Sequence, residues 1–108
     1  MKDLNYAIKI FNTGRYFECH DVLEELWKQT EGKEKDFYKG LIHAAVAMHL
    51  LSEKRIEGAI KRSNSSIELL RNYEPSFLNI NTSSLIKQLE NHRDLINKEI
   101  PMISIKLD

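Results

Sequence analysis

The chain has 108 residues, the length of one domain rather than two, and 42% of its residues are apolar, which is ordinary for a globular protein. It carries 16 basic and 16 acidic residues, so its formal net charge at pH 7 is zero. This balance argues against a nucleic-acid partner held by a broad basic surface, because neutralising phosphates requires an excess of Lys and Arg.

The first predicted helix begins after Asp3, whose carboxylate can cap it, and ends near Asn12. Gly14 follows, and glycine readily takes the left-handed backbone conformation that ends many helices. The second predicted helix spans residues 15–29 and repeats apolar residues at helical spacing. Its apolar stripe consists of Tyr16, Cys19, Leu23, Leu26 and Trp27. Cys19 is the only cysteine, and on this stripe we expect a buried, unreactive thiol.

The third predicted helix, residues 34–53, is apolar around most of its circumference from Gly40 onward. A helix of this kind is usually surrounded by other helices, so we expect it at the centre of the fold. Small residues on one of its sides, Gly40 and Ala44 among them, predict the close approach of a neighbouring helix.

Two further helices are predicted at residues 56–73 and 83–98, and each is followed by a proline, which lacks the backbone donor that a helix needs. The last residues, 102–108, are expected to lie extended over the helices. Short connections make consecutive helices antiparallel. The sequence therefore predicts an all-α fold, a compact bundle of about five antiparallel helices with a central apolar helix, in one domain over residues 1–108.

A polar strip borders the apolar stripe within YFECHDVLEELW, residues 16–27. His20 and Glu24 lie four residues apart, as do Asp21 and Glu25, so each pair shares one side of the helix. An imidazole and a carboxylate one turn apart can supply two ligands to a divalent metal. The strip is therefore a candidate metal site.

Further ligands in helical bundles come from facing helices. The third helix offers His43 and His49, which are six residues apart and face different sides, so we do not expect both at one site. His49 repeats the histidine–carboxylate spacing with Glu53 and is the predicted third ligand. A lone histidine among apolar residues is more often hydrogen-bonded in the core, which is our interpretation of His43. His92 lies on a polar side of the last helix and is expected at the surface.

The same strip has a second interpretation. Carboxylates at helical spacing from a lysine usually form a solvated face with ion pairs worth about 0.3–0.5 kcal/mol. Asp21 and Glu25, however, border the apolar stripe, where carboxylates need partners. If those partners are Arg15, Lys39 or Arg55, the strip is a structural salt-bridge network without chemistry.

Other residues are expected to surround the strip. Glu18 lies on another side of the same helix, and Trp27 fills the core with its indole N–H reaching an acceptor. Tyr38 and Lys39 begin the central helix and are expected to face the acidic strip across the turn at Gly32.

These residues resemble those of a known family. FNTGRYFECHDVLEELW, FYKGLIHAAVAMH and EGA at residues 57–59 are similar to the signature of a small helical prokaryotic family, domain of unknown function 309, sometimes labelled a predicted metal-dependent hydrolase. The resemblance covers about residues 11–73 and implies a compact helical domain. The matching positions are Phe11, Gly14, Glu18, His20, Glu24, Trp27, Gly40 and Gly58. Asp21 stands where the family often has glutamate, and His43 where it tends to have glutamine, which argues against His43 as a general family ligand.

Two functions remain open at this point. In the first, the protein is a metal-dependent hydrolase in which His20 and Glu24 bind a divalent metal, and Asp21 or Glu25 adds a ligand or acts as general base. In the second, it is a non-catalytic helical interaction module, and the same cluster is a hydrogen-bond and salt-bridge network. The substrate would be a small molecule of unspecified class, and self-association is left open.

Location and membrane contact follow from simple patterns. The most apolar segment, GLIHAAVAMHLL, is shorter than the roughly 20 residues that span a bilayer, so no membrane partner is expected. The first ten residues lack the features of a signal peptide, and a single cysteine fits a reducing compartment. The sequence therefore predicts a cytoplasmic protein.

Overall fold

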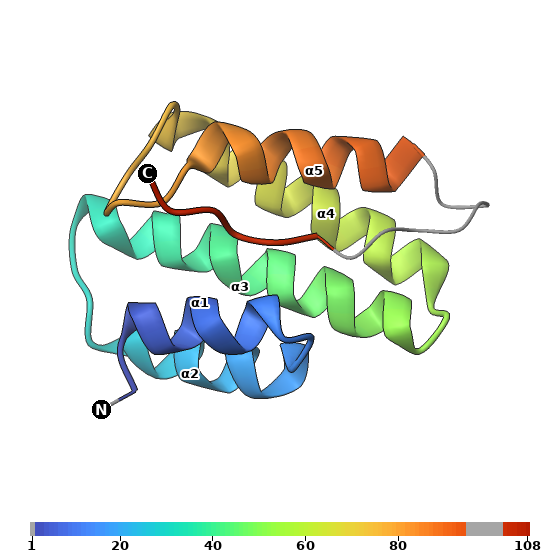
Figure 1. The fold of residues 1–108 in the computed structure, drawn as a ribbon, viewed down its shortest axis with the longest axis horizontal. Coiled ribbons are helices and arrows are strands. Elements are labelled where there is room, and N and C mark those ends of the chain that lie inside the picture. The colour runs from blue at the N-terminus through green and yellow to red at the C-terminus, as the bar shows by residue number, and fades with distance from the viewer. Residues whose placement is uncertain (1, 95–102) are drawn as a thin grey trace.

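The computed structural model describes residues 2–94 and 103–108. Within them, helices follow one another in the order α1 (Leu4–Asn12), α2 (Tyr16–Lys28), α3 (Lys33–Ser52), α4 (Ile56–Leu70) and α5 (Thr82–Asp94), with a short 3-10 helix, Arg71–Tyr73, after α4. The helices pack antiparallel to their neighbours in a bundle that measures 37 × 26 × 21 Å (Figure 1). The predicted all-α fold is confirmed.

Helix α3 occupies the centre, as its apolar composition predicts, with α1 and α2 on one side and α4 and α5 on the other (Figure 1). The close approach predicted at Gly40 is present, because a Cβ added there would lie 2.8 Å from Cδ2 of Leu70. The hydroxyl of Ser66 donates to the Gly40 carbonyl over 2.7 Å and joins the two helices further. In the described part of the chain, no helix, α3 included, has both the length and the apolar content needed to cross a bilayer.

The two ends of α1 and the buried cysteine of α2 agree with the sequence predictions. Asp3 Oδ1 accepts a hydrogen bond from the backbone N–H of Tyr6 over 3.0 Å and caps α1. Gly14 has a φ of 83°, in the left-handed region that glycine tolerates. Cys19 is fully buried, its thiol donates to the Ala7 carbonyl over 3.3 Å, and burial raises the pKa of the thiol to about 12. The thiol is therefore protonated and unreactive at neutral pH, as predicted.

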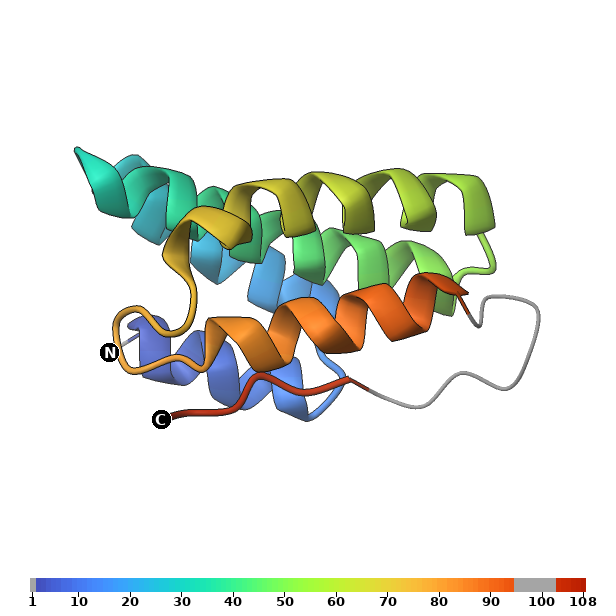
Figure 2. The same ribbon diagram turned by 90° about the horizontal axis from the view of Figure 1, so that it is seen from above.

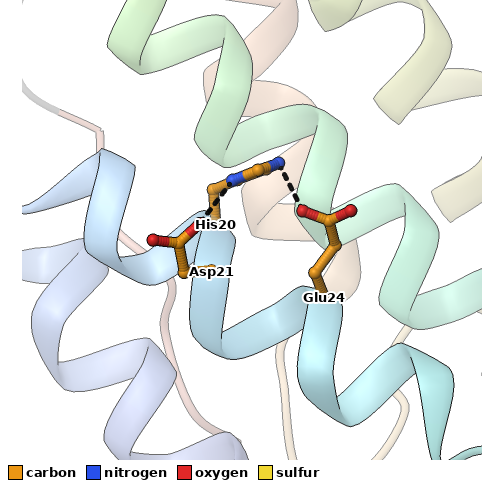
Figure 3. A group of neighbouring side chains, drawn as sticks. All are labelled: His20, Asp21 and Glu24. Atoms are coloured by element: carbon orange, nitrogen blue, oxygen red, sulfur yellow. Dashed lines mark hydrogen bonds and ion pairs between the residues drawn. The ribbon is translucent and has the colours of Figure 1, made fainter.

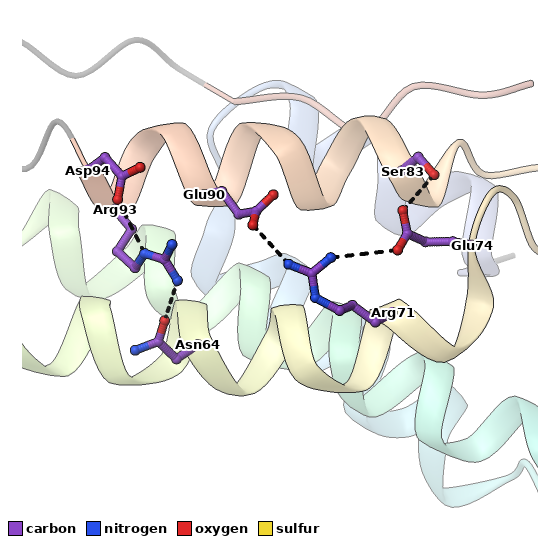
Figure 4. A network of polar contacts seen from close by, with 7 residues as sticks. All are labelled: Asn64, Arg71, Glu74, Ser83, Glu90, Arg93 and Asp94. Atoms are coloured by element: carbon purple, nitrogen blue, oxygen red, sulfur yellow. Dashed lines mark hydrogen bonds and ion pairs between the residues drawn. The ribbon is translucent and has the colours of Figure 1, made fainter.

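Polar contacts join α4 and its 3-10 extension to α5 (Figure 4). Arg71 lies between two carboxylates, with its Nη2 atom 2.8 Å from Glu90 and its Nη1 atom 3.7 Å from Glu74. Arg93 donates to the side-chain oxygen of Asn64 over 2.9 Å. The contacts of Arg71 with Glu90 and of Arg93 with Asn64 reach across to and from α5 at two separate places, so they help to fix the position of α5 along α4.

The C-terminal tail, residues 103–108, lies extended beside α1 and α5 (Figure 2). The side-chain amide of Asn12 exchanges two hydrogen bonds with the backbone of Ile105, at 3.0 and 2.7 Å. Gln88 exchanges two more with the backbone of Ser104, at 2.8 and 2.9 Å. An extended tail over the helices was predicted and is confirmed for these residues. The predicted end of the last helix near residue 98 lies outside the described residues.

His92 contradicts the prediction that it lies at the surface, because only 3% of the residue is exposed. Leu85 and Leu89 are fully buried on α5, and His92 continues their row at helical spacing, so the ring turns into the core. Neither ring nitrogen has a hydrogen-bond partner among the described residues. Burial lowers the pKa of His92, so the ring is neutral at neutral pH.

Candidate functional site

His20, Asp21 and Glu24 gather on one side of α2 (Figure 3). Nε2 of His20 is 2.9 Å from Oε2 of Glu24, and Nδ1 is 3.3 Å from Oδ1 of Asp21. One ligand atom from each residue lies within 4.8 Å of the others. The exposed fractions of the side chains are 27% for His20, 60% for Asp21 and 43% for Glu24. The group therefore lies at the rim of the core, open to solvent on one side.

The two contacts of His20 constrain the protons on its ring. A carboxylate only accepts hydrogen bonds, so both contacts are hydrogen bonds only when both ring nitrogens carry protons. A neutral ring would bring one nitrogen lone pair against a carboxylate oxygen. If His20 and Glu24 held a divalent cation, the conflict would be removed, because both lone pairs would bind the ion. The arrangement therefore suits a charged imidazole or a metal ion.

Two hollows flank His20 between α2, α3 and α4. The larger hollow has a volume of about 230 Å³ and the smaller hollow about 190 Å³. Both are bordered by His20 and Arg62. The larger hollow is further lined by Glu24, Trp27, Lys39, Ile42 and His43, and the smaller by Phe17, Val46 and His49. Titratable side chains from three helices thus surround the imidazole of His20.

His43 borders the larger hollow, and its contact with Arg62 defines its tautomer. Nη1 of Arg62 is 3.1 Å from Nδ1 of His43. A guanidinium can only donate, so Nδ1 accepts and the ring proton is on Nε2. Burial lowers the pKa of His43, and the charges of Arg62 and Lys39 lower it further. His43 is therefore a neutral ring that offers one N–H donor.

His49, the predicted third ligand, borders the smaller hollow instead. Its Nε2 atom is 3.6 Å from Oε1 of Glu53, the carboxylate four residues later. The ring of Phe17 contacts both histidines, with its centroid 5.3 Å from that of His49 and 6.1 Å from that of His20. His49 does not belong to the group whose ligand atoms converge, so a side-chain rearrangement is needed before it can share an ion with His20.

Several predicted members of the strip have other partners. Glu25 is exposed and lies 3.5 Å from Lys28. Glu18 accepts hydrogen bonds from Arg15 and from the hydroxyl of Tyr6, which together lower the pKa of the Glu18 carboxyl. Neither carboxylate belongs to the group formed by His20, Asp21 and Glu24.

Two aromatic residues differ in part from expectation. Tyr38 is buried and borders a separate hollow beside Asp3 and Glu34, not the strip. Trp27 is half-buried, with the ammonium of Lys35 over its ring at 4.0 Å from the centroid. Its indole N–H is buried and finds no acceptor in the part of the chain that the structure describes, although one was expected. Trp27 is thus a wall of the larger hollow as well as part of the core.

The cations predicted to pair with the strip lie elsewhere. Arg15 pairs with Glu18, and Arg55 approaches Glu53 at 4.0 Å. Lys39 borders the larger hollow, as its predicted position opposite the strip suggests, but forms no ion pair within residues 2–94 and 103–108. Asp21 and Glu24 therefore contact the imidazole of His20 rather than a lysine or an arginine.

Of the residues that border these hollows, sequence reasoning missed Arg62. Phe17 is 59% exposed and precedes His20 by three residues, so helical spacing predicts its position beside the strip. Arg62 lies on α4, and no spacing within α2 or α3 indicates it. Only the packing of α4 against α3 brings its guanidinium to His43.

Comparison with known proteins places these residues in a family context. The sequence profile of the family described as "Domain of unknown function (DUF309)" matches residues 4–61. An uncharacterized protein of Bacillus subtilis strain 168, YpuF, is 35% identical over 69 residues, which are 63% of this chain and 40% of that protein. An uncharacterized protein of Aquifex aeolicus strain VF5 is 31% identical over 91 residues, which are 83% of this chain and 26% of that protein. The chain thus spans less than half the length of either relative.

Proposed function

This chain belongs to the DUF309 family, and from that premise we propose that it is a metal-dependent hydrolase whose divalent ion is bound by His20 and Glu24. The observation that supports the proposal is the placement of His20 between two carboxylates. Nε2 and Glu24 approach to 2.9 Å, and a ligand pair of this type suits zinc, manganese or iron. The matched range of the family contains the whole group.

The residues around the ion would have distinct roles. Asp21 accepts a hydrogen bond from Nδ1 of His20, which orients the ring and leaves the lone pair of Nε2 for the metal. His20 and Glu24 would hold the ion at the edge of the larger hollow, which both side chains line, and two protein ligands would leave room for a water or a substrate atom. When bound, the ion would lower the pKa of a water molecule toward neutrality and polarise the bond to be hydrolysed. Asp21 is also the nearest further carboxylate that can accept a proton from such a water.

Metal analysis of protein purified without a histidine tag tests the proposal. We expect bound metal in the native chain, none in His20→Ala or Glu24→Gln, and a rise in melting temperature on adding zinc, manganese or iron. Asp21→Asn should weaken binding by about 10- to 100-fold, the usual effect of losing an orienting carboxylate. Glu25→Gln is the matched control, because it removes a neighbouring carboxylate outside the group and should bind like the native chain.

His49→Ala tests the predicted third ligand in the same assay. Loss of bound metal in this variant would show that His49 is a ligand after a side-chain rearrangement. Unchanged metal binding would show that His49 is not a ligand. If the native chain contains no metal and its melting temperature does not respond to any of the three ions, the hydrolase proposal fails.

The second candidate is a structural role, and the mutual contacts of the three side chains favour it. A protonated His20 would satisfy both carboxylates without an ion. In the presence of a chelator, Glu24→Gln should then lower the free energy of unfolding by about 0.2–1 kcal/mol. A buried pair would be expected to contribute about 1–3 kcal/mol, but the Glu24 side chain is 43% exposed. An unchanged free energy of unfolding under chelation would contradict this role.

A further inference from the structure

Arg62 is the one arginine without a carboxylate partner in the described part of the chain. The other arginines, Arg15, Arg55, Arg71 and Arg93, each have a carboxylate oxygen within 4.0 Å. Arg62 instead donates to the neutral ring of His43. Among residues 2–94 and 103–108, no carboxylate therefore accepts from its five N–H donors. A planar guanidinium without a carboxylate partner can bind an oxyanion by donating two parallel N–H···O hydrogen bonds to it.

Two more donors border the same hollow as Arg62. Lys39 precedes His43 by four residues on α3, so both side chains lie on one side of that helix. The contact with Arg62 leaves the proton of His43 on Nε2, where it can be donated to a ligand. The larger hollow thus combines a guanidinium, an ammonium and a neutral N–H. Its one carboxylate, Glu24, lies against His20.

The rest of the lining sets the size and character of the occupant. Trp27 and Ile42 supply an apolar wall beside the cations. The volume of about 230 Å³ is below the range of about 300–1,000 Å³ for pockets that hold drug-sized ligands, so the ligand is small. A carboxylate monoanion would balance only one of the two positive charges, whereas a phosphate dianion can balance both and accept hydrogen bonds from both cations and from His43.

We propose that the larger hollow binds the phosphate group of a small phosphomonoester through Arg62, Lys39 and His43, with the apolar part of the ligand against Trp27 and Ile42. As a binding site, the hollow does not require a metal. As the substrate site of a hydrolase, it rests on the proposed function, and the reaction is then cleavage of the P–O bond to the alcohol. Water supplies the new oxygen on phosphorus and the proton of the alcohol, so the products are an alcohol and inorganic phosphate.

Trp27 is the only tryptophan in the chain and borders the hollow, so its fluorescence reports binding. The chelator-treated protein is titrated with inorganic phosphate, n-butyl phosphate and butyrate. We expect saturable binding of both phosphates, tighter binding of the butyl ester, and weaker binding of butyrate. No saturable response to the phosphates, or equal affinity for butyrate and butyl phosphate, overturns the proposal.

Charge-removing variants assign the binding to the hollow. Arg62→Gln and Lys39→Gln should each weaken phosphate binding by about tenfold or more, as expected when a charge-assisted hydrogen bond is lost. Lys61→Gln is the matched control, because it removes the same charge from the neighbouring position on α4, which does not line the hollow, and should bind like the native chain. Equal affinities for Arg62→Gln and Lys61→Gln overturn the proposal. Thermal melts establish that each variant is folded.

Release of inorganic phosphate from n-butyl phosphate, measured with added metal, separates this inference from the hydrolase proposal. Release that disappears in both His20→Ala and Arg62→Gln supports both. Phosphate binding without release under any metal overturns hydrolysis of this substrate class and leaves the binding site intact. Release that persists in Arg62→Gln overturns the binding site and leaves the hydrolase proposal intact.

Discussion

The arginines at the contact of α4 with α5 and at its contact with α3 lie in opposite electrostatic settings. Arg71 belongs to the 3-10 helix after α4 and Arg93 to α5, whereas Arg62 belongs to α4 itself. Toward α5, Arg71 lies between Glu90 and Glu74, and Arg93 is bonded to Asn64 (Figure 4). Toward α3, Arg62 meets a neutral histidine in the wall of a hollow. A cation whose charge is matched by the protein contributes to structure, whereas one without a carboxylate partner is available to an anionic ligand. The side of α4 that faces α3 is therefore where we expect chemistry.

The largest loss of stability is expected from a substitution where α3 packs against α4. Gly40→Ala places a Cβ 2.8 Å from Cδ2 and 2.9 Å from Cγ of Leu70, which is fully buried. Overpacking of this kind should lower the free energy of unfolding by about 1–3 kcal/mol, measured by urea titration. Because the spacing of α3 and α4 also sets the width of the larger hollow, phosphate affinity should fall as well.

Gly58→Ala is the control for Gly40→Ala. Its Cβ would meet a single atom, Cδ1 of Leu50, at 3.1 Å, and that atom is the end of a flexible side chain. Alanine is favoured over glycine inside a helix by about 0.5–1 kcal/mol, so this variant should be as stable as the native chain or more stable. If the two variants lost the same free energy of unfolding, the close contact between Gly40 and Leu70 would not be the cause of the loss.

An intermediate effect, on the pH dependence of stability, is expected from His92 and His43, whose pKa values are lowered. An unfolded histidine takes up its proton near pH 6.5, whereas burial delays protonation of His92 in the folded chain to lower pH. As the pH falls below 6.5, the unfolded chain binds more protons, and the free energy of unfolding should decrease. His43, whose pKa is lowered by burial and by Arg62 and Lys39, contributes with the same sign.

His92→Leu should leave the free energy of unfolding at pH 7 unchanged or raised, since it removes two buried nitrogens without hydrogen-bond partners among the described residues. It should also reduce the loss of stability below pH 6.5. Urea titrations at a series of pH values check both statements, and an acid slope equal to that of the native chain would contradict them.

The smallest effect on stability is expected at the ion pair between the 3-10 helix and α5. Arg71 is 51% exposed and Glu90 is 35% exposed, so solvent screens their attraction. Arg71→Gln should lower the free energy of unfolding by about 0.2–1 kcal/mol, with no change in phosphate affinity. Arg62→Gln should instead change the free energy of unfolding little and weaken phosphate binding. If both variants behaved alike in both measurements, the contrast between the two sides would have no functional meaning.

Helical spacing explains why some of these features could be predicted from the sequence. The apolar runs and their breaks at Gly14, Gly32 and Pro75 lead directly to the observed helices. His20, Asp21 and Glu24 belong to one turn, so their proximity needs only the geometry of a helix. In contrast, the burial of His92 and the position of Arg62 depend on how α4 and α5 are rotated against α3. Those rotations are set by packing between helices, which the local pattern of one helix does not contain.

The paired amides that hold the tail have a consequence for the order in which the chain folds. Asn12 and Ile105 are 93 residues apart in sequence, and contacts over such separations form late because closing the intervening loop costs entropy. During synthesis, α1 to α4 can associate through local contacts before residues 103–108 exist. A nascent chain stopped before the tail would leave the side-chain amides of Asn12 and Gln88 without these backbone partners. Docking of the tail therefore marks the step at which the first and last helices become one cooperative unit.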